Sequence, residues 1–245
     1  MSPFRPIPTT GLLPRAVAFD LDKTLISGDA TLGWTAFLYE KGVVTDPVYR
    51  EVNDRMVQAY KAGTLDIAAW LRQAVPAYTG LDAVTRTRLV DDFISEKIAP
   101  LVYTEGLERI REAKAAGMLT LIISASNSFF VKPLADRLFG VDEALGCNLV
   151  MTPDGHVTPE LDGIPTFQEG KISRLTETLA RHGLTPADTV FFTDSRNDLP
   201  LAQAAGDCEV VNPDPTLREA ALRHGWPIHT WHILSTNAAV SVEKT

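Results

Sequence analysis

The sequence has few cysteines, no long apolar run and no cluster of basic residues. Its two cysteines, Cys147 and Cys208, provide neither a disulfide framework nor a zinc-ligand spacing, so we interpret them as buried side chains in a reducing cytoplasm. No stretch approaches the roughly 20 apolar residues of a membrane-spanning helix, and the proline-rich N-terminus lacks the apolar centre of a secretory signal. We therefore expect a cytoplasmic protein without a membrane anchor.

The formal net charge is −8, from 23 basic and 31 acidic residues. The basic residues are scattered rather than arranged in a stripe, which argues against nucleic acid as a partner. A chain of 245 residues, 45% of them hydrophobic, suits one α/β core with an insertion or a small second domain. The sequence gives no indication of the oligomeric state.

Short apolar runs alternate with helical segments over much of the chain. Buried strands are predicted at residues 15–19, 119–123 and 189–193, because each is a brief apolar run typical of parallel sheets. Strands that alternate with helices indicate a mainly parallel sheet covered on both faces, which is a three-layer, Rossmann-like α/β core. Ligands of such sheets bind outside the carboxyl ends of the strands.

The segments around these strands define the expected domains. Residues 29–99 have helical periodicity and no convincing strand, which predicts a helical cap inserted after the first strand. Residues 145–157 resemble a hairpin that turns at 153–155, and residues 208–211 form the last expected strand. The expected divisions are an arm at 1–14, a catalytic core at 15–28 and 100–234, the cap at 29–99 and a loose tail at 235–245.

Pairs of acidic residues follow the first and third strands. Asp20 and Asp22 lie just after the first strand, and Asp194 and Asp198 follow the third. Carboxylates that converge at one sheet edge repel each other, and a Mg²⁺ ion, which prefers hard oxygen ligands, would offset that repulsion. Taken singly, these acids could also be turn formers or, for Asp198, a helix cap.

Two further residues could bind phosphate at the same edge. Ser124 ends the second strand, where its hydroxyl and the backbone N–H of Ala125 could hold a phosphate oxygen, although Ser126 or Asn127 could simply cap the next helix. Lys171 stands in the first turn of a predicted helix, where its charge opposes the helix dipole unless an anion is its partner. In isolation it could also be a solvated surface lysine.

Together these sites resemble the motifs of the haloacid dehalogenase superfamily of phosphatases, over about residues 15 to 230. The matching residues are Asp20-Leu21-Asp22-Lys23-Thr24, Ser124, Lys171, and Asp194 with Asp198. The resemblance implies that Asp20 attacks phosphorus and forms an aspartyl-phosphate, and that Asp22 protonates the leaving alcohol and then activates water. It also implies that Ser124 and Lys171 bind the phosphoryl oxygens. The implied Mg²⁺ ligands are Asp20, the backbone carbonyl of Asp22, Asp194 and, as a direct ligand or a partner of one, Asp198.

Within the superfamily the chain resembles the phosphoserine-phosphatase-like branch. Segments 52–54, 60–66 and 163–171 are similar to bacterial histidinol-phosphatases of that branch. The resemblance favours L-histidinol phosphate, a small cationic metabolite for which Asp29 and Asp54 could provide countercharge. Lys23 departs from the small residue common at its position in the superfamily, and its side chain is expected to point away from the phosphate.

Three alternatives remain open. A phosphoserine phosphatase would need an arginine for the substrate carboxylate, with Arg50, Arg55 and Arg72 as candidates that could equally be helix-surface residues. A phosphotransferase would share the aspartyl-phosphate and pass the phosphoryl group to an alcohol. A receiver-like phospho-acceptor protein would have a similar residue set without turnover, but such domains are shorter and have no helical insertion.

Overall fold

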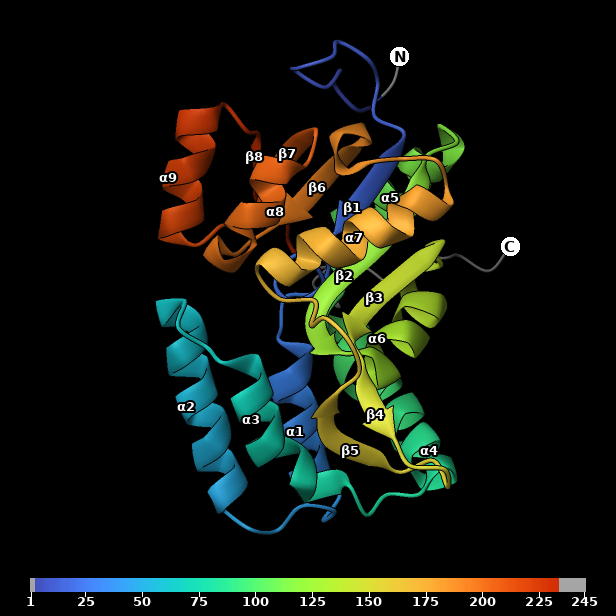
Figure 1. Ribbon diagram of the computed structural model, residues 1–245, viewed down its shortest axis with the longest axis vertical. Helices are drawn as coiled ribbons and strands as arrows, with labels where there is room; N and C mark the ends of the chain where they lie inside the picture. The colour runs from blue at the N-terminus through green and yellow to red at the C-terminus, as the bar shows by residue number, and fades with distance from the viewer. Residues whose placement is uncertain (1–2, 234–245) are drawn as a thin grey trace, which may run out of the picture.

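The computed structural model describes residues 3–233 and contains a six-stranded parallel sheet between two layers of helices (Figure 1). The strands run in the order β3-β2-β1-β6-β7-β8, and each neighbouring pair is parallel. Their bounds are β1 (Ala16–Phe19), β2 (Leu119–Asn127), β3 (Glu143–Cys147), β6 (Thr189–Thr193), β7 (Asp207–Val211) and β8 (Ile228–His229). The predicted three-layer α/β fold is confirmed.

The sheet separates two hydrophobic cores. The helices that cover it are α5 (Thr104–Ala115), α6 (Ser128–Leu134), α7 (Glu169–Arg181), α8 (Leu199–Ala204) and α9 (Pro215–His224). Val17 and Phe19 of β1 face the core that α5 and α6 share, whereas Ala16 and Ala18 face α7, α8 and α9. Both faces of β1 are therefore buried, which explains why its sequence is apolar throughout rather than alternating.

The segment expected to be a helical insertion is helical. Its elements are α1 (Ala30–Glu40), α2 (Val48–Ala62), α3 (Ile67–Ala74), a 3-10 turn (Val75–Tyr78), α4 (Ala83–Phe93) and a π-helical turn (Ile94–Ile98). Trp34 of α1 contacts the ring of Phe93 from α4 and the ring of Phe130 from α6. The insertion therefore packs on the helical layer of the sheet through a shared aromatic cluster.

The hairpin predicted for residues 145–157 is wrong in its first strand. Residues 143–147 form β3, which pairs with β2 in the main sheet. The hairpin instead consists of β4 (Leu149–Met151) and β5 (Val157–Leu161), with its turn at 153–155 as predicted. A single residue, Asn148, separates β3 from β4, so the hydropathy pattern reads as one strand. In Figure 1, β5 lies beside α3, so the hairpin adds a wall to the insertion.

Both ends of the described chain pack on the sheet. The predicted N-terminal arm is irregular, but Phe4 and Ile7 are buried and Arg5 pairs with Asp207 at 2.6 Å. Strand β8 was not expected because it is only two residues long. The predicted tail at 235–245 lies outside the described residues. Among the helices of residues 3–233, none is long and apolar enough to cross a membrane.

Candidate active site

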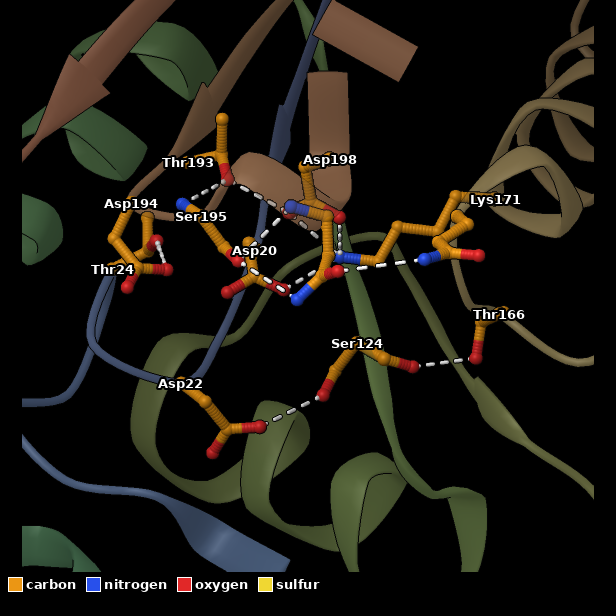
Figure 2. Close-up of polar contacts among 12 residues, drawn as sticks. Asp20, Asp22, Thr24, Ser124, Thr166, Lys171, Thr193, Asp194, Ser195 and Asp198 are labelled. Atoms are coloured by element: carbon orange, nitrogen blue, oxygen red, sulfur yellow. Dashed lines mark hydrogen bonds and ion pairs between the residues drawn. The ribbon is translucent and has the colours of Figure 1, made fainter. Parts of the chain in front are cut away.

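Asp20, Ser124 and Asp194 meet at the carboxyl edge of the sheet, as predicted (Figure 2). Asp20 directly follows β1 and Asp194 directly follows β6, the strand next to it. Ser124 lies on the other side of β1, in β2, which continues to Asn127 instead of ending at Ser124. Strand β2 lies on one side of β1 and β6 on the other, so the order of the strands reverses at β1. Ligands of parallel sheets usually bind at such a topological switch point.

Lys171 lies between two carboxylates and is only 2% exposed. Its Nζ is 2.7 Å from Asp20 Oδ1 and 2.7 Å from Asp198 Oδ1, and the Thr193 hydroxyl donates to Asp198 Oδ2 at 2.7 Å. Burial lowers the pKa of Lys171, but Asp198 and Asp20 outweigh it and raise the pKa above its usual value. The ammonium group therefore stays charged, and the alternative of a solvated surface lysine is wrong.

The Asp22 side chain is turned away from Lys171, toward the start of α1 and the end of β2 (Figure 2). Its Oδ1 accepts a hydrogen bond from the Ala30 N–H at 2.5 Å. Its Oδ2 accepts from the Ser126 hydroxyl at 2.9 Å and from the Ser124 hydroxyl at 3.3 Å. These bonds fix the orientation of Asp22 independently of Asp20.

The two carboxyl groups of the first motif differ in their electrostatics. Burial, reinforced by the Asp29 and Asp20 carboxylates, raises the pKa of Asp22 to about 8. Burial also raises the pKa of Asp20, but only to about 6, because the positive charge of Lys171 lowers it. Neighbouring acids whose environments separate their pKa values can take different roles, one as proton donor and the other as nucleophile.

The carboxylates of Asp20 and Asp194 are the ones available to a cation. Asp194 accepts a hydrogen bond from the Thr24 hydroxyl at 3.5 Å. Burial, and after it the negative charge of Asp20, raise the pKa of Asp194 well above the usual value. Asp198 is instead engaged by Lys171 and Thr193. Within residues 3–233, no three His, Cys, Asp or Glu side chains group as a metal site. The residues still fit Mg²⁺, which commonly binds one or two protein carboxylates and completes its shell with water.

A pocket opens above Asp20, polar toward the sheet and apolar toward the insertion. The sheet side comprises Asp20, Asp22, Ala125, Ser126 and Asp194, and the insertion side comprises Met56, Tyr60, Leu65, Ile67 and Trp70. Asp29, Lys23 and Thr31 complete the lining. The Asp29 carboxylate also accepts the Leu32 N–H at 3.0 Å, so it caps α1 as well as facing the pocket.

Several expected positions differ from the observed ones. Lys23 lines the pocket with its ammonium 5.9 Å from the centre of the Tyr60 ring, and its direction relative to the phosphate stays a prediction. Asp54 and Arg50 line a separate hollow between α1 and α2, and neither Arg55 nor Arg72 is among the lining residues of the pocket. Ser124 is fully buried behind the pocket wall. Its neighbours Ala125 and Ser126 form that wall.

Three contact residues were not found by sequence reasoning. Ser126 was considered only as a helix cap, yet its hydroxyl binds Asp22. Thr193 ends a predicted strand, and nothing in the sequence connects it with Asp198. Tyr60 lies in the segment predicted to be helical, at a position that helical spacing places on the apolar face. Helical periodicity predicts that such a tyrosine is partly buried, but it does not tell which segment the tyrosine contacts.

Comparison with known proteins shows the family to which the chain belongs. Residues 17–203 match the haloacid dehalogenase-like hydrolase family. The chain is 34% identical to a histidinol-phosphatase from Neisseria meningitidis, over 86% of this chain and 96% of that protein. A crystal structure of a protein of unknown function from Bordetella pertussis has a TM-score of 0.80 and 32% identity, covering 89% of this chain and 98% of that one.

A phospho-aspartyl intermediate analogue of phosphoserine phosphatase has a TM-score of 0.65 over 89% of this chain and 93% of that chain, at 21% identity. This likeness, at so low an identity, concerns the fold. The chain belongs to the haloacid dehalogenase-like hydrolase family. Within that family it belongs to the phosphoserine-phosphatase-like branch of phosphatases, which confirms the predicted family and enzyme class.

Proposed function

We propose that this protein is a Mg²⁺-dependent phosphomonoesterase that forms an aspartyl-phosphate on Asp20. The observation that supports the proposal most is the placement of Asp20, which lines the pocket while its Oδ1 lies 2.7 Å from the buried Lys171 ammonium. An ion pair on one oxygen fixes the carboxylate and leaves the other oxygen available for attack on phosphorus. Phosphoryl transfer depends mainly on such positioning and on charge stabilisation.

In the proposed reaction Asp20 attacks phosphorus as the ester bond breaks, and Asp22 gives its proton to the leaving alcohol. A water molecule then attacks the phosphorus of the aspartyl-phosphate, and Asp22 takes its proton. The products are inorganic phosphate and the Asp20 carboxylate. The hydrogen bonds from Ala30 and Ser126 hold Asp22 ready for both proton transfers.

The remaining site residues bind the phosphoryl group and the metal. We assign phosphoryl contacts to Lys171, the Ser124 hydroxyl and the Ala125 N–H. Mg²⁺ would be held by Asp20, Asp194 and the backbone carbonyl of Asp22, and it supplies positive charge for the phosphate. Asp198 then positions Lys171 rather than the metal, because its carboxylate is already bonded to Lys171 and Thr193.

The pocket lining supports a small amine-bearing phosphate ester, with L-histidinol phosphate as the proposed substrate. The Asp29 carboxylate and the Trp70 ring both line the pocket, where they offer countercharge and an aromatic surface to a cationic, ring-bearing alcohol. The similar protein from Neisseria meningitidis bears the name histidinol-phosphatase. Phosphoserine is the second candidate, since phosphoserine phosphatases are also among the relatives.

The domain division and the location are part of the same proposal. We assign residues 29–99 as a cap over the core formed by 15–28 and 100–234. The support is that α2 and α3 contribute the apolar wall of the pocket. A cap at this position would exclude water from the phosphoryl group while the alcohol leaves. The cytoplasmic location stays a prediction, consistent with two buried free cysteines, Cys147 and Cys208.

The mechanism is tested with Asp20→Asn, which removes the nucleophile and preserves side-chain size. Phosphate release from p-nitrophenyl phosphate in Mg²⁺ buffer should fall by about a thousandfold or more. Circular dichroism should show a folded protein, because Asp20 lies at the strand edge. The exposed Asp162 provides the matched control, Asp162→Asn, with unchanged activity. Near-normal activity of Asp20→Asn would refute covalent catalysis at this residue.

The substrate is tested separately by comparing kcat/KM for L-histidinol phosphate and L-phosphoserine. A large preference for phosphoserine would overturn the substrate assignment but leave the phosphatase mechanism in place. Products formed with an added alcohol distinguish hydrolysis from phosphotransfer. A folded wild-type protein that becomes phosphorylated but does not turn over would favour the phospho-acceptor alternative.

A further inference from the structure

Tyr60 connects the insertion to the loops that carry the proposed catalytic residues. It lies near the end of α2 and is partly buried. Its hydroxyl donates to Ser195 Oγ at 3.3 Å, and its backbone carbonyl accepts from Asn197 Nδ2 at 3.1 Å. Ser195 directly follows Asp194, and Asn197 directly precedes Asp198. Tyr60 therefore contacts two of the three residues that separate Asp194 from Asp198 in the loop that carries the last acid pair.

The ring of Tyr60 contacts two other segments of the site. Its centroid is 6.0 Å from that of Phe167, in the loop that leads into α7 and Lys171. The Lys23 ammonium lies 5.9 Å from the Tyr60 centroid, and Lys23 directly follows Asp22. All of these contacts join the insertion to segments that bear proposed catalytic residues.

The neighbouring residue Gln168 strengthens the same junction. Its Nε2 lies 3.4 Å from the carbonyl oxygen of Gly63, just past α2, and 3.4 Å from Asn197 Oδ1. Its backbone has a φ of 47°, an unfavourable value for a residue with a side chain. Such strain persists only where surrounding contacts hold it, and it often marks functional segments. Here the strained residue bridges the end of α2 and the loop at 195–198.

We infer that Tyr60 is a positioning residue that holds the loop at 194–198 and Lys23 in working geometry while the insertion lies over the pocket. The inference rests on the proposed phosphatase function. The Tyr60 ring packs against Phe167 at the border of the hydrophobic core, whereas its hydroxyl and its backbone carbonyl form hydrogen bonds to the loop at 194–198. The hydrogen bonds can break and re-form without exposing a large apolar surface. Tyr60 thus makes the alignment of Asp194 and Asp198 depend on the seating of α2.

Tyr60→Phe tests this inference because it removes the hydroxyl and retains the ring contacts with Phe167 and Lys23. We expect kcat to fall about tenfold, with KM changed much less, because the loss of one hydrogen bond misaligns the loop rather than the substrate. Ser195→Ala should have at least as large an effect, because it also removes the bond that the Ser195 hydroxyl accepts from the Asn197 N–H at 3.2 Å, and the double variant should be no worse than Ser195→Ala alone. Tyr49→Phe, on the same helix, is the matched control and should match wild type.

Hydrogen exchange gives a readout independent of activity. Tyr60→Phe should speed amide exchange at residues 194–198, whereas Tyr49→Phe should not. Because Tyr60→Phe also weakens the attachment of the insertion to the core, this variant should transfer a larger fraction of the phosphoryl group to added glycerol instead of water. Unchanged kcat and unchanged exchange in Tyr60→Phe would overturn the inference. If the wild-type protein showed no phosphatase activity, the proposed function would fail, but exchange at 194–198 would still decide whether Tyr60 holds the loop.

Discussion

At the residue scale, the buried Lys171 is the main source of positive charge beneath the pocket. It is the shared partner of Asp20 and Asp198, both of which are nearly inaccessible to water. Desolvated carboxylates are costly without a cation, whereas the same groups in a bonded triad are tolerated. The stability of this part of the fold and the chemistry of the site therefore depend on one ammonium group.

Lys171→Met should lower the free energy of unfolding by about 3–5 kcal/mol, because it leaves two buried carboxylates without their cation. Urea denaturation in EDTA measures this without a contribution from bound metal. The control Lys114→Met removes a half-exposed lysine on α5, 3.7 Å from Asp142, and should cost much less. An unchanged unfolding free energy for Lys171→Met would mean that the Lys171 ammonium does not stabilise the two buried carboxyl groups.

The sequence could indicate which residues gather at the site but not how they are oriented. Asp20 and Asp194 were found because each ends an apolar run, and Lys171 because its charge is unfavourable in a first helical turn. The orientation of Asp22 depends on Ala30 and Ser126, which are brought to it by the fold. The engagement of Asp198 by Lys171 is likewise a contact between distant segments.

At the element scale, prediction succeeded where a strand or helix has its own local signal. Strands β1 and β6 are short, mainly apolar runs because helices cover both faces of the sheet. The boundary between β3 and β4 was missed because Leu145 and Leu149 are both apolar and the change of sheet has no local signature. The contact of β5 with α3 is a tertiary feature, so the extra wall beside the insertion was not foreseen.

The start of α1 allows the two roles of Asp29 to be separated. Asp29→Ala removes both the helix cap and the charge, and should lower the free energy of unfolding by about 1 kcal/mol. Asp29→Ser keeps a capping oxygen for the Leu32 N–H, so its stability should stay close to wild type. Both variants should raise the KM for L-histidinol phosphate roughly tenfold, because both lose a charge-assisted contact to the amine.

Thermal or urea unfolding and steady-state kinetics of the two Asp29 variants give the answer together. If Asp29→Ser kept the wild-type KM while Asp29→Ala did not, the aspartate would act only as a cap. p-Nitrophenyl phosphate, which has no amine, serves as the control substrate, and its KM should change little in either variant.

At the scale of the whole molecule, an acidic protein must attract a phosphate dianion. The net charge is −8, and the pocket itself is lined by four acidic side chains, those of Asp20, Asp22, Asp29 and Asp194. A second hollow adjoins the pocket and shares Lys23, Tyr60 and Asp194 with it. Lys61 and Arg196 also line this hollow, so three exposed cations gather beside the acidic site. Asp194 and Asp214 also line the hollow, so its lining has one more basic than acidic side chain, and a local excess of basic groups can guide an anion despite an unfavourable net charge.

The effect of these cations should appear in the salt dependence of kcat/KM. For wild type, kcat/KM should fall as salt rises, because charges are screened over about 10 Å at 0.1 M ionic strength. The double variant Lys61→Gln with Arg196→Gln should have a lower kcat/KM at low salt and a flatter salt dependence, with kcat little changed. Arg181→Gln with Arg223→Gln, on outer helix surfaces, removes the same net charge and should keep the wild-type slope. Equal flattening in both pairs would mean that overall charge, rather than the hollow at Lys61 and Arg196, governs capture of the phosphate ester.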